Sequence, residues 1–171
     1  LCYTIRMVKN TQPYLARWWS KHSDDTVQCS LCPRCCLIKK GDRGFCFVRQ
    51  NINGELVSVS YGWTSGSCVD PIEKKPLYHF YPGAHVFSFG TVGCNLGCKF
   101  CQNWPISKVE DLDRLVEKAS PRDIANIARN AQCDLVAFTY NEPVISAEYV
   151  IDTAKECQAL GLRTIVVTDG Y

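Results

Sequence analysis

The sequence lacks a long apolar run, a secretory leader and an excess of charge of either sign. No stretch approaches the ~20 apolar residues that a helix needs to span a bilayer, and the N-terminus, LCYTIRMVKN, has no apolar core of a signal peptide. Nineteen Lys and Arg residues oppose 17 Asp and Glu residues, which gives a formal net charge of +2. Domains that bind nucleic acid usually carry a basic excess, so nucleic acid is not expected as a partner. We therefore expect a cytoplasmic protein without a membrane segment.

The composition that is present is typical of a globular domain. Hydrophobic residues make up 46% of the 171 residues and charged residues 21%. That content is enough to bury a core, and it argues against intrinsic disorder. The first residue is Leu1 rather than Met, so we expect a fragment or a processed chain.

Twelve cysteines are the most unusual feature of the composition. They are grouped along the chain, and no export signal accompanies them. Clustered cysteines in a chain of this kind are more often metal ligands or catalytic thiols than disulfides. The sequence therefore favours a reducing compartment and metal binding.

The chain changes character near residue 85. Residues 1–85 are rich in turn residues and cysteine, and NING at 51–54 predicts a hairpin between two short strands. Residues 86–171 alternate apolar strands with helical patterns. We therefore predict a small cysteine-rich N-terminal lobe at 1–85 and a second domain at 86–171.

The second half predicts three strands, HVFSFG, DLVAFTY and RTIVVTDG, with helices between them. The helix expected from Ser120 has Ser120 as N-cap, Pro121 in the first turn and Asp123 as the partner of a capping box. The next helix opens at Pro143, with an apolar stripe through Ala147, Val150, Ile151, Ala154 and Cys157, and ends at Gly161. A further helix is expected within VEDLDRLVEKA, residues 109–119.

Alternating strands and helices predict an α/β fold with a parallel sheet. A closed (β/α)8 barrel needs about 250 residues, so this length allows only part of one. We expect a partial (β/α) barrel that is truncated after the third strand.

The segment GCNLGCKFC places Cys94, Cys98 and Cys101 directly after the first of these strands. Active sites of parallel α/β folds are built at the carboxyl ends of the strands. Thiolates select zinc or iron–sulfur clusters, and an electron-carrying [4Fe–4S] cluster is ligated by four cysteines. Three cysteines would leave one iron open to an exogenous ligand. The alternative is a zinc site completed by His79 or His85, although zinc sites usually pair their cysteines as C-x2-C repeats.

The C-x3-C-x2-C spacing, with Phe100 just before Cys101, resembles that of radical S-adenosylmethionine (SAM) enzymes. The resemblance implies a [4Fe–4S] cluster held by Cys94, Cys98 and Cys101, with the amino and carboxylate groups of SAM on the open iron. It also implies reductive cleavage of SAM to methionine and a 5′-deoxyadenosyl radical that abstracts a hydrogen atom. No side chain need act as an acid or a base, so no catalytic proton-transfer residue is predicted.

A second match is TYNEP at residues 139–143, which is similar in position to the segment of this superfamily that contacts the amino group of SAM. It implies that Asn141 and Glu142 bind SAM. The simpler interpretation is that these residues start the next helix. TDG at 168–170 follows the third strand where similar enzymes carry Thr-Asn-Gly, and Asp169 departs from that pattern.

Over a wider span, DPIEKKPLYHF, PGAHVFSFGTVGCNLGCKFCQNWPIS and FTYNEP resemble the radical SAM enzyme of the AmmeMemoRadiSam system. That group is akin to pyruvate formate-lyase activating enzymes, that is, [formate-C-acetyltransferase]-activating enzymes. The resemblance implies an oxidoreductase that activates a glycyl-radical enzyme or modifies another protein or small molecule. Its expected partners are SAM, an electron donor such as a flavodoxin or ferredoxin, and a protein substrate. The competing interpretation is an iron–sulfur electron carrier or a zinc-stabilised binding module without SAM chemistry.

The N-terminal cysteines have a spacing of their own, C-x2-C-x3-C-x9-C. Four soft ligands predict a closed site with a structural or electron-relay role, and zinc and a second iron–sulfur cluster both remain open. Cys35 is an extra cysteine that could replace its neighbour as a ligand. The predicted second metal site comprises Cys29, Cys32, Cys36 and Cys46.

Overall fold

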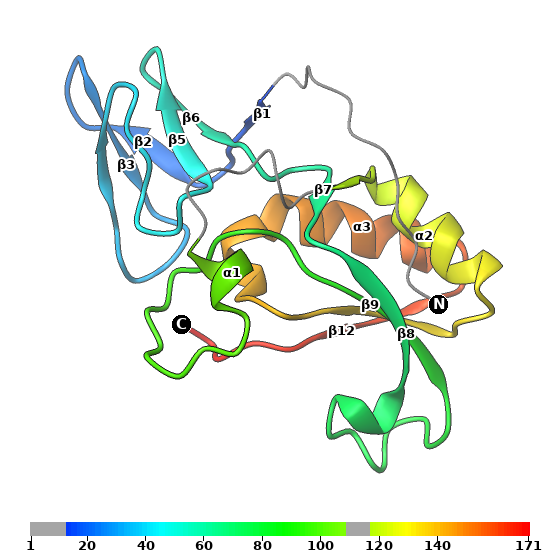
Figure 1. Cartoon of the computed structure of the whole chain (residues 1–171). Coiled ribbons are helices and arrows are strands. Elements are labelled where there is room, and N and C mark those ends of the chain that lie inside the picture. The colour runs from blue at the N-terminus through cyan, green and yellow to red at the C-terminus, as the bar shows by residue number, and fades with distance from the viewer. Residues whose placement is uncertain (1–12, 109–116) are drawn as a thin grey trace.

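The centre of the molecule is a four-stranded sheet in the order β12–β11–β9–β8 (Figure 1). The structure is a computed structural model that describes residues 13–108 and 117–171. Strands β9 (His85–Phe89), β11 (Leu135–Phe138) and β12 (Arg163–Val166) are parallel, as the sequence predicts. β8 (Ser67–Pro71) pairs antiparallel with β9. The α/β fold is confirmed as a mixed architecture, and its continuation into a barrel stays a prediction.

Two helices cover one face of this sheet (Figure 1). α2 (Pro121–Asn130) begins with the predicted capping box, in which the Ser120 side chain accepts from the Asp123 amide and the Asp123 side chain accepts from the Ser120 amide. A 3-10 turn, η3 (Pro143–Ser146), precedes α3 (Ala147–Ala159). Together the helices and the sheet bury the main core, which includes Phe87, Phe89, Ile124, Ala125, Ala128, Val136, Phe138, Tyr149 and Cys157.

The buried face of α3 differs from the predicted apolar stripe. Its buried residues are Glu148, Tyr149, Thr153 and Cys157. The stripe is confirmed in part, because Cys157 lies in the main core and Val150 and Ala154 pack against it. The burial of Glu148 was not predicted, because its basic partner comes from another element. The predicted start of this helix at Pro143 is confirmed as η3 followed by α3.

The N-terminal lobe consists of two small three-stranded sheets. One is β1 (Tyr14–Leu15), β6 (Glu55–Ser58) and β5 (Arg49–Ile52) in the order β1–β6–β5. The predicted hairpin is confirmed as β5–β6, with Asn53 and Gly54 in the turn at positive φ.

The other N-terminal sheet has the order β2–β3–β4. It is formed by β2 (Trp19–Lys21), β3 (Thr26–Cys29) and β4 (Leu37–Lys39). Both small sheets lie beside the end of the central sheet at which α1 (Trp104–Ser107) is found (Figure 1).

The remaining elements connect the two halves. β7 (Trp63–Thr64) pairs with β10 (Glu117–Lys118), and η1 (Ile72–Lys74) follows β8. Most of the helix expected at 109–119 lies outside the described residues, and its last part is β10. Because β8 joins the central sheet, strand pairing crosses the boundary predicted between residues 85 and 86, and that division stays a prediction. None of the helices within the described ranges has the length and apolar content to cross a membrane.

Candidate functional site: two cysteine-bearing loops at one edge of the sheet

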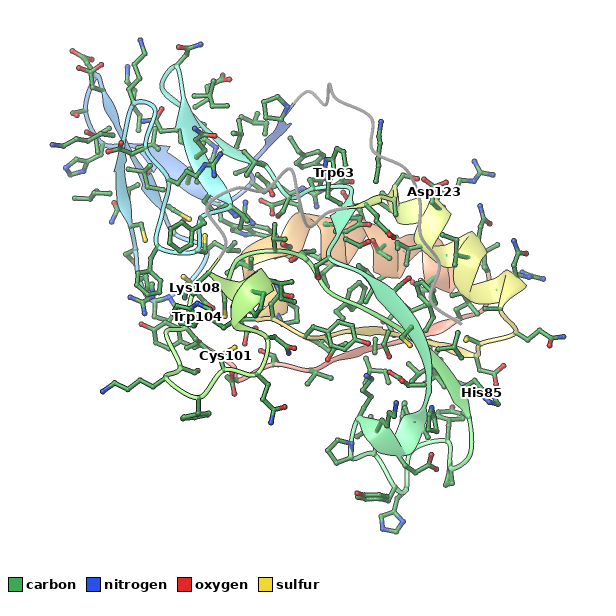
Figure 2. The ribbon with its side chains drawn as sticks, in the orientation of Figure 1. Trp63, His85, Cys101, Trp104, Lys108 and Asp123 are labelled. Atoms are coloured by element: carbon green, nitrogen blue, oxygen red, sulfur yellow. The ribbon has the colours of Figure 1, made fainter. Side chains whose placement is uncertain are left out.

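The loop that carries Cys94, Cys98 and Cys101 leaves the sheet at the carboxyl end of β9, as predicted from the sequence. Cys94 is buried, whereas Cys98 and Cys101 are half-buried. All three thiols are free, as are the other described cysteines. The loop leads into α1, where Cys101, Trp104 and Lys108 lie close together (Figure 2).

Hydrogen bonds fix the path of this loop. The amide of Gly93 donates to the carbonyl of Ile106 at 2.8 Å. The Lys108 ammonium donates to the carbonyl of Cys94 at 2.9 Å, and burial lowers the pKa of Lys108. The Cys101 sulfur lies 3.5 Å from the Ser107 hydroxyl. The beginning and end of the loop are therefore both tied to α1.

Asn141 holds the loop from the neighbouring strand. Its side-chain amide donates to the Thr91 hydroxyl at 2.9 Å and to the Gly93 carbonyl at 2.8 Å, and its oxygen accepts from the Thr91 amide at 3.2 Å. The sequence singled out Asn141 as a SAM contact. The structure places it where it positions the start of the cysteine loop.

Glu142 makes equivalent contacts on the other side of β11. One carboxylate oxygen accepts from the Thr168 hydroxyl at 2.6 Å, and the other accepts from the Asp169 amide at 2.9 Å. Glu142 is only 3% exposed and also accepts from the Val144 amide, so it starts η3 as the simpler interpretation requires. Asn141 and Glu142 thus connect the ends of all three parallel strands, and Asp169 takes part through its main chain.

One of the two histidines considered as zinc ligands, His85, lies at the opposite end of β9 from this loop. β9 alone separates His85 from Phe89 by roughly 13 Å at the usual rise per residue, and Cys94 comes five residues after Phe89. Figure 2 shows His85 at the far end of the strand from Cys101. His79 and His85 are both exposed. In the part of the chain that the structure describes, neither histidine belongs to a group of three or more side chains arranged to hold a metal ion.

The side chains after the last cysteine are mostly exposed. Gln102 and Asn103 are exposed, and Trp104 is 54% exposed, so it does not pack in the core. Asn103 donates to the carbonyl of Tyr140 at 2.8 Å. An open cavity of about 360 Å³ lies beside them, lined by residues that include Cys68, Gln102, Asn103 and Tyr140. The cavity adjoins the carboxyl edge of the parallel strands.

The four N-terminal cysteines line a second, much smaller cavity. Cys29, Cys32, Cys36 and Cys46 surround about 20 Å³, together with Arg34, Arg49 and Asn95 among others. Burial raises the pKa of the Cys29 thiol to about 11 and also raises the pKa of the Cys46 thiol. Cys35 is exposed and does not line the cavity, so it is separated from the predicted set.

Neither set of thiols is closed around a single point. Within residues 13–108 and 117–171, no three Cys, His, Asp or Glu side chains are already arranged to hold a metal ion. The donor chemistry nevertheless fits soft metal centres, because both sets consist of free thiols. The ligand assignments stay predictions.

The two cysteine-bearing loops are in direct contact. A Cβ atom on Gly93 would lie 2.2 Å from the carbonyl oxygen of Cys46, so the main chains meet there. The Arg34 side chain donates to the carbonyl of Asn95 at 2.5 Å. The Phe45 ring lies against both Arg34 and Lys108. This contact could not be predicted from the sequence, because it joins segments that are far apart in the chain.

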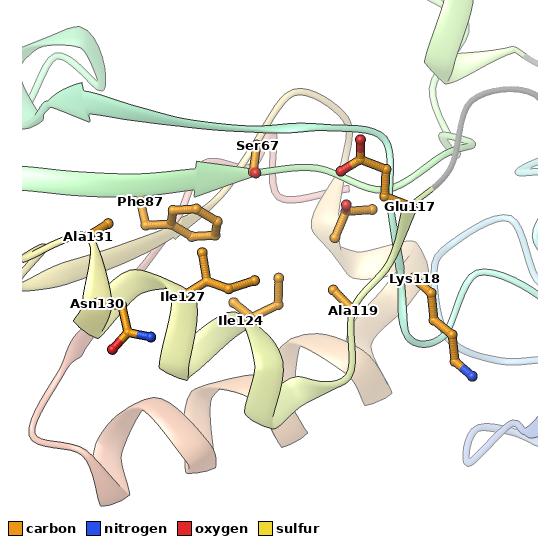
Figure 3. A pocket seen from close by; sticks show the side chains of 10 residues that line it. Ser67, Phe87, Glu117, Lys118, Ala119, Ile124, Ile127, Asn130 and Ala131 are labelled. Atoms are coloured by element: carbon orange, nitrogen blue, oxygen red, sulfur yellow. The ribbon is translucent and has the colours of Figure 1, made fainter. Parts of the chain in front are cut away.

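A third cavity, of about 270 Å³, lies between α2 and the central sheet, away from the cysteines (Figure 3). Its lining is mostly apolar and includes Phe87, Ile124 and Ile127. Glu117 and Lys118 are the charged residues in its lining.

The second half of the chain matches the family described as the Radical SAM superfamily, over residues 89–171. These residues form a radical SAM superfamily domain. The match begins at the last residue of β9 and includes the whole cysteine loop and TYNEP. In this superfamily a [4Fe–4S] cluster and SAM are the general cofactors.

A longer relative matches nearly all of this chain. An uncharacterized protein of Methanocaldococcus jannaschii is 41% identical over 156 residues, which cover 91% of this chain and 47% of the relative. The chain thus spans about half the length of the relative that it matches. No solved structure matches the chain.

Proposed function

We propose that the protein binds a [4Fe–4S] cluster through Cys94, Cys98 and Cys101 and cleaves SAM reductively. The observation that carries the proposal is the position of three free thiols at the carboxyl end of β9, inside the radical SAM domain. When bound, the cluster would supply one electron to the sulfonium of SAM, giving methionine and a 5′-deoxyadenosyl radical for hydrogen abstraction.

The role of the protein in this chemistry is to position groups and to exclude water. Asn141 and Lys108 hold the main chain of the cysteine loop on two sides. The open cavity of about 360 Å³ supplies room for a nucleoside-sized molecule next to Gln102 and Asn103. The contact of Asn141 and Glu142 with the amino group of SAM stays a prediction. Their observed hydrogen bonds support a positioning role that is compatible with it.

The finer reaction that we propose is the activation of a partner protein by glycyl-radical formation, or the modification of another protein or a small molecule. The electron would come from a flavodoxin or ferredoxin. This part of the proposal rests on the family resemblance of the motifs alone. It concerns the activity of the whole protein, and the chain spans about half the length of the relative that it matches.

The decisive experiment is anaerobic reconstitution of the full-length protein with iron and sulfide, followed by an assay for 5′-deoxyadenosine from SAM and dithionite. The wild type should form the product, and Cys98→Ala should form none, because a cluster with two remaining cysteine ligands is not held. Cys35→Ala is the matched control, since Cys35 is an exposed cysteine outside both sets. Formation of 5′-deoxyadenosine by Cys98→Ala at the wild-type rate would exclude this cluster assignment.

A further inference from the structure

The small cavity among the N-terminal cysteines brings together thiols from three separate stretches of chain. Cys29 ends β3, Cys32 and Cys36 lie in the turn that follows, and Cys46 comes from the loop after β4. Two of the four, Cys29 and Cys46, are buried. Four thiols that line one cavity supply the donor set of a closed four-ligand site, and the radical SAM domain, which begins at residue 89, does not account for them.

The lobe around this cavity has little else to hold it together. Its strands are two to four residues long, and its core cluster comprises five buried residues, Ala16, Val27, Cys29, Ile38 and Leu56. Lobes with so small a core are usually stabilised by disulfides or a structural metal. All the described cysteines are free, so disulfides do not serve here.

We propose that Cys29, Cys32, Cys36 and Cys46 bind one zinc ion that stabilises the N-terminal lobe. Four cysteines form the closed tetrahedral set of a structural zinc site. The volume of about 20 Å³ favours zinc of the two metals left open by the sequence. It is close to the space of a single water-sized sphere, which suits one ion and not an iron–sulfur cubane. The thiols surround this space without closing on it, so binding the ion would draw them inward.

The charges around the cavity suit an ion with four thiolates. Zinc with four thiolates carries a formal charge of −2, and a buried charge of that size needs compensation. Arg34 and Arg49 line the same cavity, and because Arg49 is paired with Glu148, Arg34 is the arginine that can offset part of this charge. Asn95 also lines it, is 1% exposed, and its side-chain oxygen has no hydrogen-bond partner. An amide oxygen is a hydrogen-bond acceptor and does not offset a negative charge, so the compensating group beside the cavity is Arg34.

The proposed ion would also support the neighbouring loop. Cys46 touches Gly93, and Arg34 hydrogen-bonds to Asn95, so the zinc site lies directly behind the start of the radical SAM cysteine loop. The zinc proposal does not depend on the proposed function, because none of its four ligands belongs to the radical SAM domain.

Metal analysis of the full-length protein tests the proposal. The protein should contain about one zinc per chain after purification, and Cys32→Ser should lose it, whereas Cys35→Ser should keep it. A variant in which Cys94, Cys98 and Cys101 are all replaced by Ala should also keep its zinc. Zinc that is lost from this triple variant, or kept in Cys32→Ser, would overturn the assignment. So would a wild type that holds a second iron–sulfur cluster and no zinc.

A second measurement needs no substitution, in case Cys32→Ser does not fold. Alkylation of the wild type, followed by mass spectrometry, should leave Cys29, Cys32, Cys36 and Cys46 protected in the zinc-loaded protein. After treatment with a strong chelator, all four should be labelled and the Tm should fall. Cys35 should be labelled in both states. Equal labelling of the four thiols before and after chelation would contradict the proposal.

Discussion

At Gly93 the main chain of the radical SAM domain runs against the carbonyl oxygen of Cys46, with no room for a side chain between them. The residue has φ of +85°, a conformation that side chains other than glycine rarely adopt. A Cβ atom there would also lie 2.8 Å from the side chain of Val48. Two independent constraints thus require glycine at this position, one from the backbone and one from the neighbouring loop.

Replacement of Gly93 by Ala should therefore be strongly destabilising. Backbone strain alone costs about 1–3 kcal/mol, and the clash with the Cys46 carbonyl adds to it. Gly97→Ala is the matched control in the same loop, because a Cβ there would meet only Phe45 at an ordinary 3.6 Å. Urea unfolding of both variants measures the difference. Equal stability of the two would show that the loops are not in contact at Gly93.

At the residue scale, the sequence singled out individual residues, but it could not predict their hydrogen-bond partners. Asn141 and Glu142 stood out because they follow a buried strand. Their hydrogen bonds run to residues about 50 and 27 positions away in the chain, and no local pattern encodes such partners. Cys94, Cys98 and Cys101 were singled out by their spacing, and their role as cluster ligands stays a prediction.

Among the elements, β5 and α3 are joined by a buried ion pair. The Arg49 guanidinium binds both carboxylate oxygens of Glu148, at 2.7 and 2.5 Å, and the two side chains are 2% and 0% exposed. Arg49 also donates to the carbonyl of Ile145 at 2.9 Å. This pair attaches the N-terminal lobe to the helix that covers the central sheet.

Removal of one partner of this pair should destabilise the protein by about 3–5 kcal/mol, because it leaves the other charge buried and alone. We expect this loss in Arg49→Met, and a smaller loss in the double variant Arg49→Met with Glu148→Met. The control is Lys21→Ala, since the exposed Lys21–Asp24 pair contributes about 0–1 kcal/mol. Chemical denaturation of the four proteins supplies the comparison. An Arg49→Met variant as stable as Lys21→Ala would contradict the role of the pair.

Local signals predicted the elements that local forces form. The capping box before α2 and the turn of the β5–β6 hairpin each depend on four consecutive residues, and both were predicted. The burial of Glu148 in α3 was missed because its partner Arg49 is 99 residues away. The predicted stripe contacts the core through Val150, Ala154 and Cys157.

For the molecule as a whole, several carboxylates depend on their basic partners. Burial raises the pKa of Glu148, but the bonds from Arg49 outweigh it and leave the pKa below its ordinary value. The pKa of Asp152 is lowered by Arg17 and Tyr61 against the effect of burial, and that of Asp70 is lowered by Lys74 and Lys75 in the same way.

The protein should therefore lose stability in acid. A carboxylate whose pKa is lowered by folding stabilises the folded state above its unfolded pKa, about 4, and the contribution disappears as the pH falls through the folded value. We expect a nearly constant Tm between pH 7 and 5 and a steep fall below about pH 4. Scanning calorimetry across that range checks the trend. Glu148→Gln should start from a lower Tm and show a shallower fall, and an unchanged slope in this variant would contradict the assignment.

The arrangement of the two halves was the part that the sequence could not predict. The parallel order of three strands followed from alternating patterns, and it was correct. The antiparallel strand β8 and the contact between the two cysteine-bearing loops were not predicted. Both depend on packing between distant segments, and the sequence of each segment does not indicate which other segment it packs against.

The close approach at Gly93 also limits which chimeric proteins can be made from this chain. An exchange of the N-terminal lobe for that of another protein would introduce a new main chain opposite Gly93, and a shift of even one ångström would push the cysteine loop out of place. The N-terminal lobe therefore cannot be exchanged by itself without disturbing the cysteine loop. Chimeras should work only when residues 29–47 and 91–101 are transplanted together from one parent.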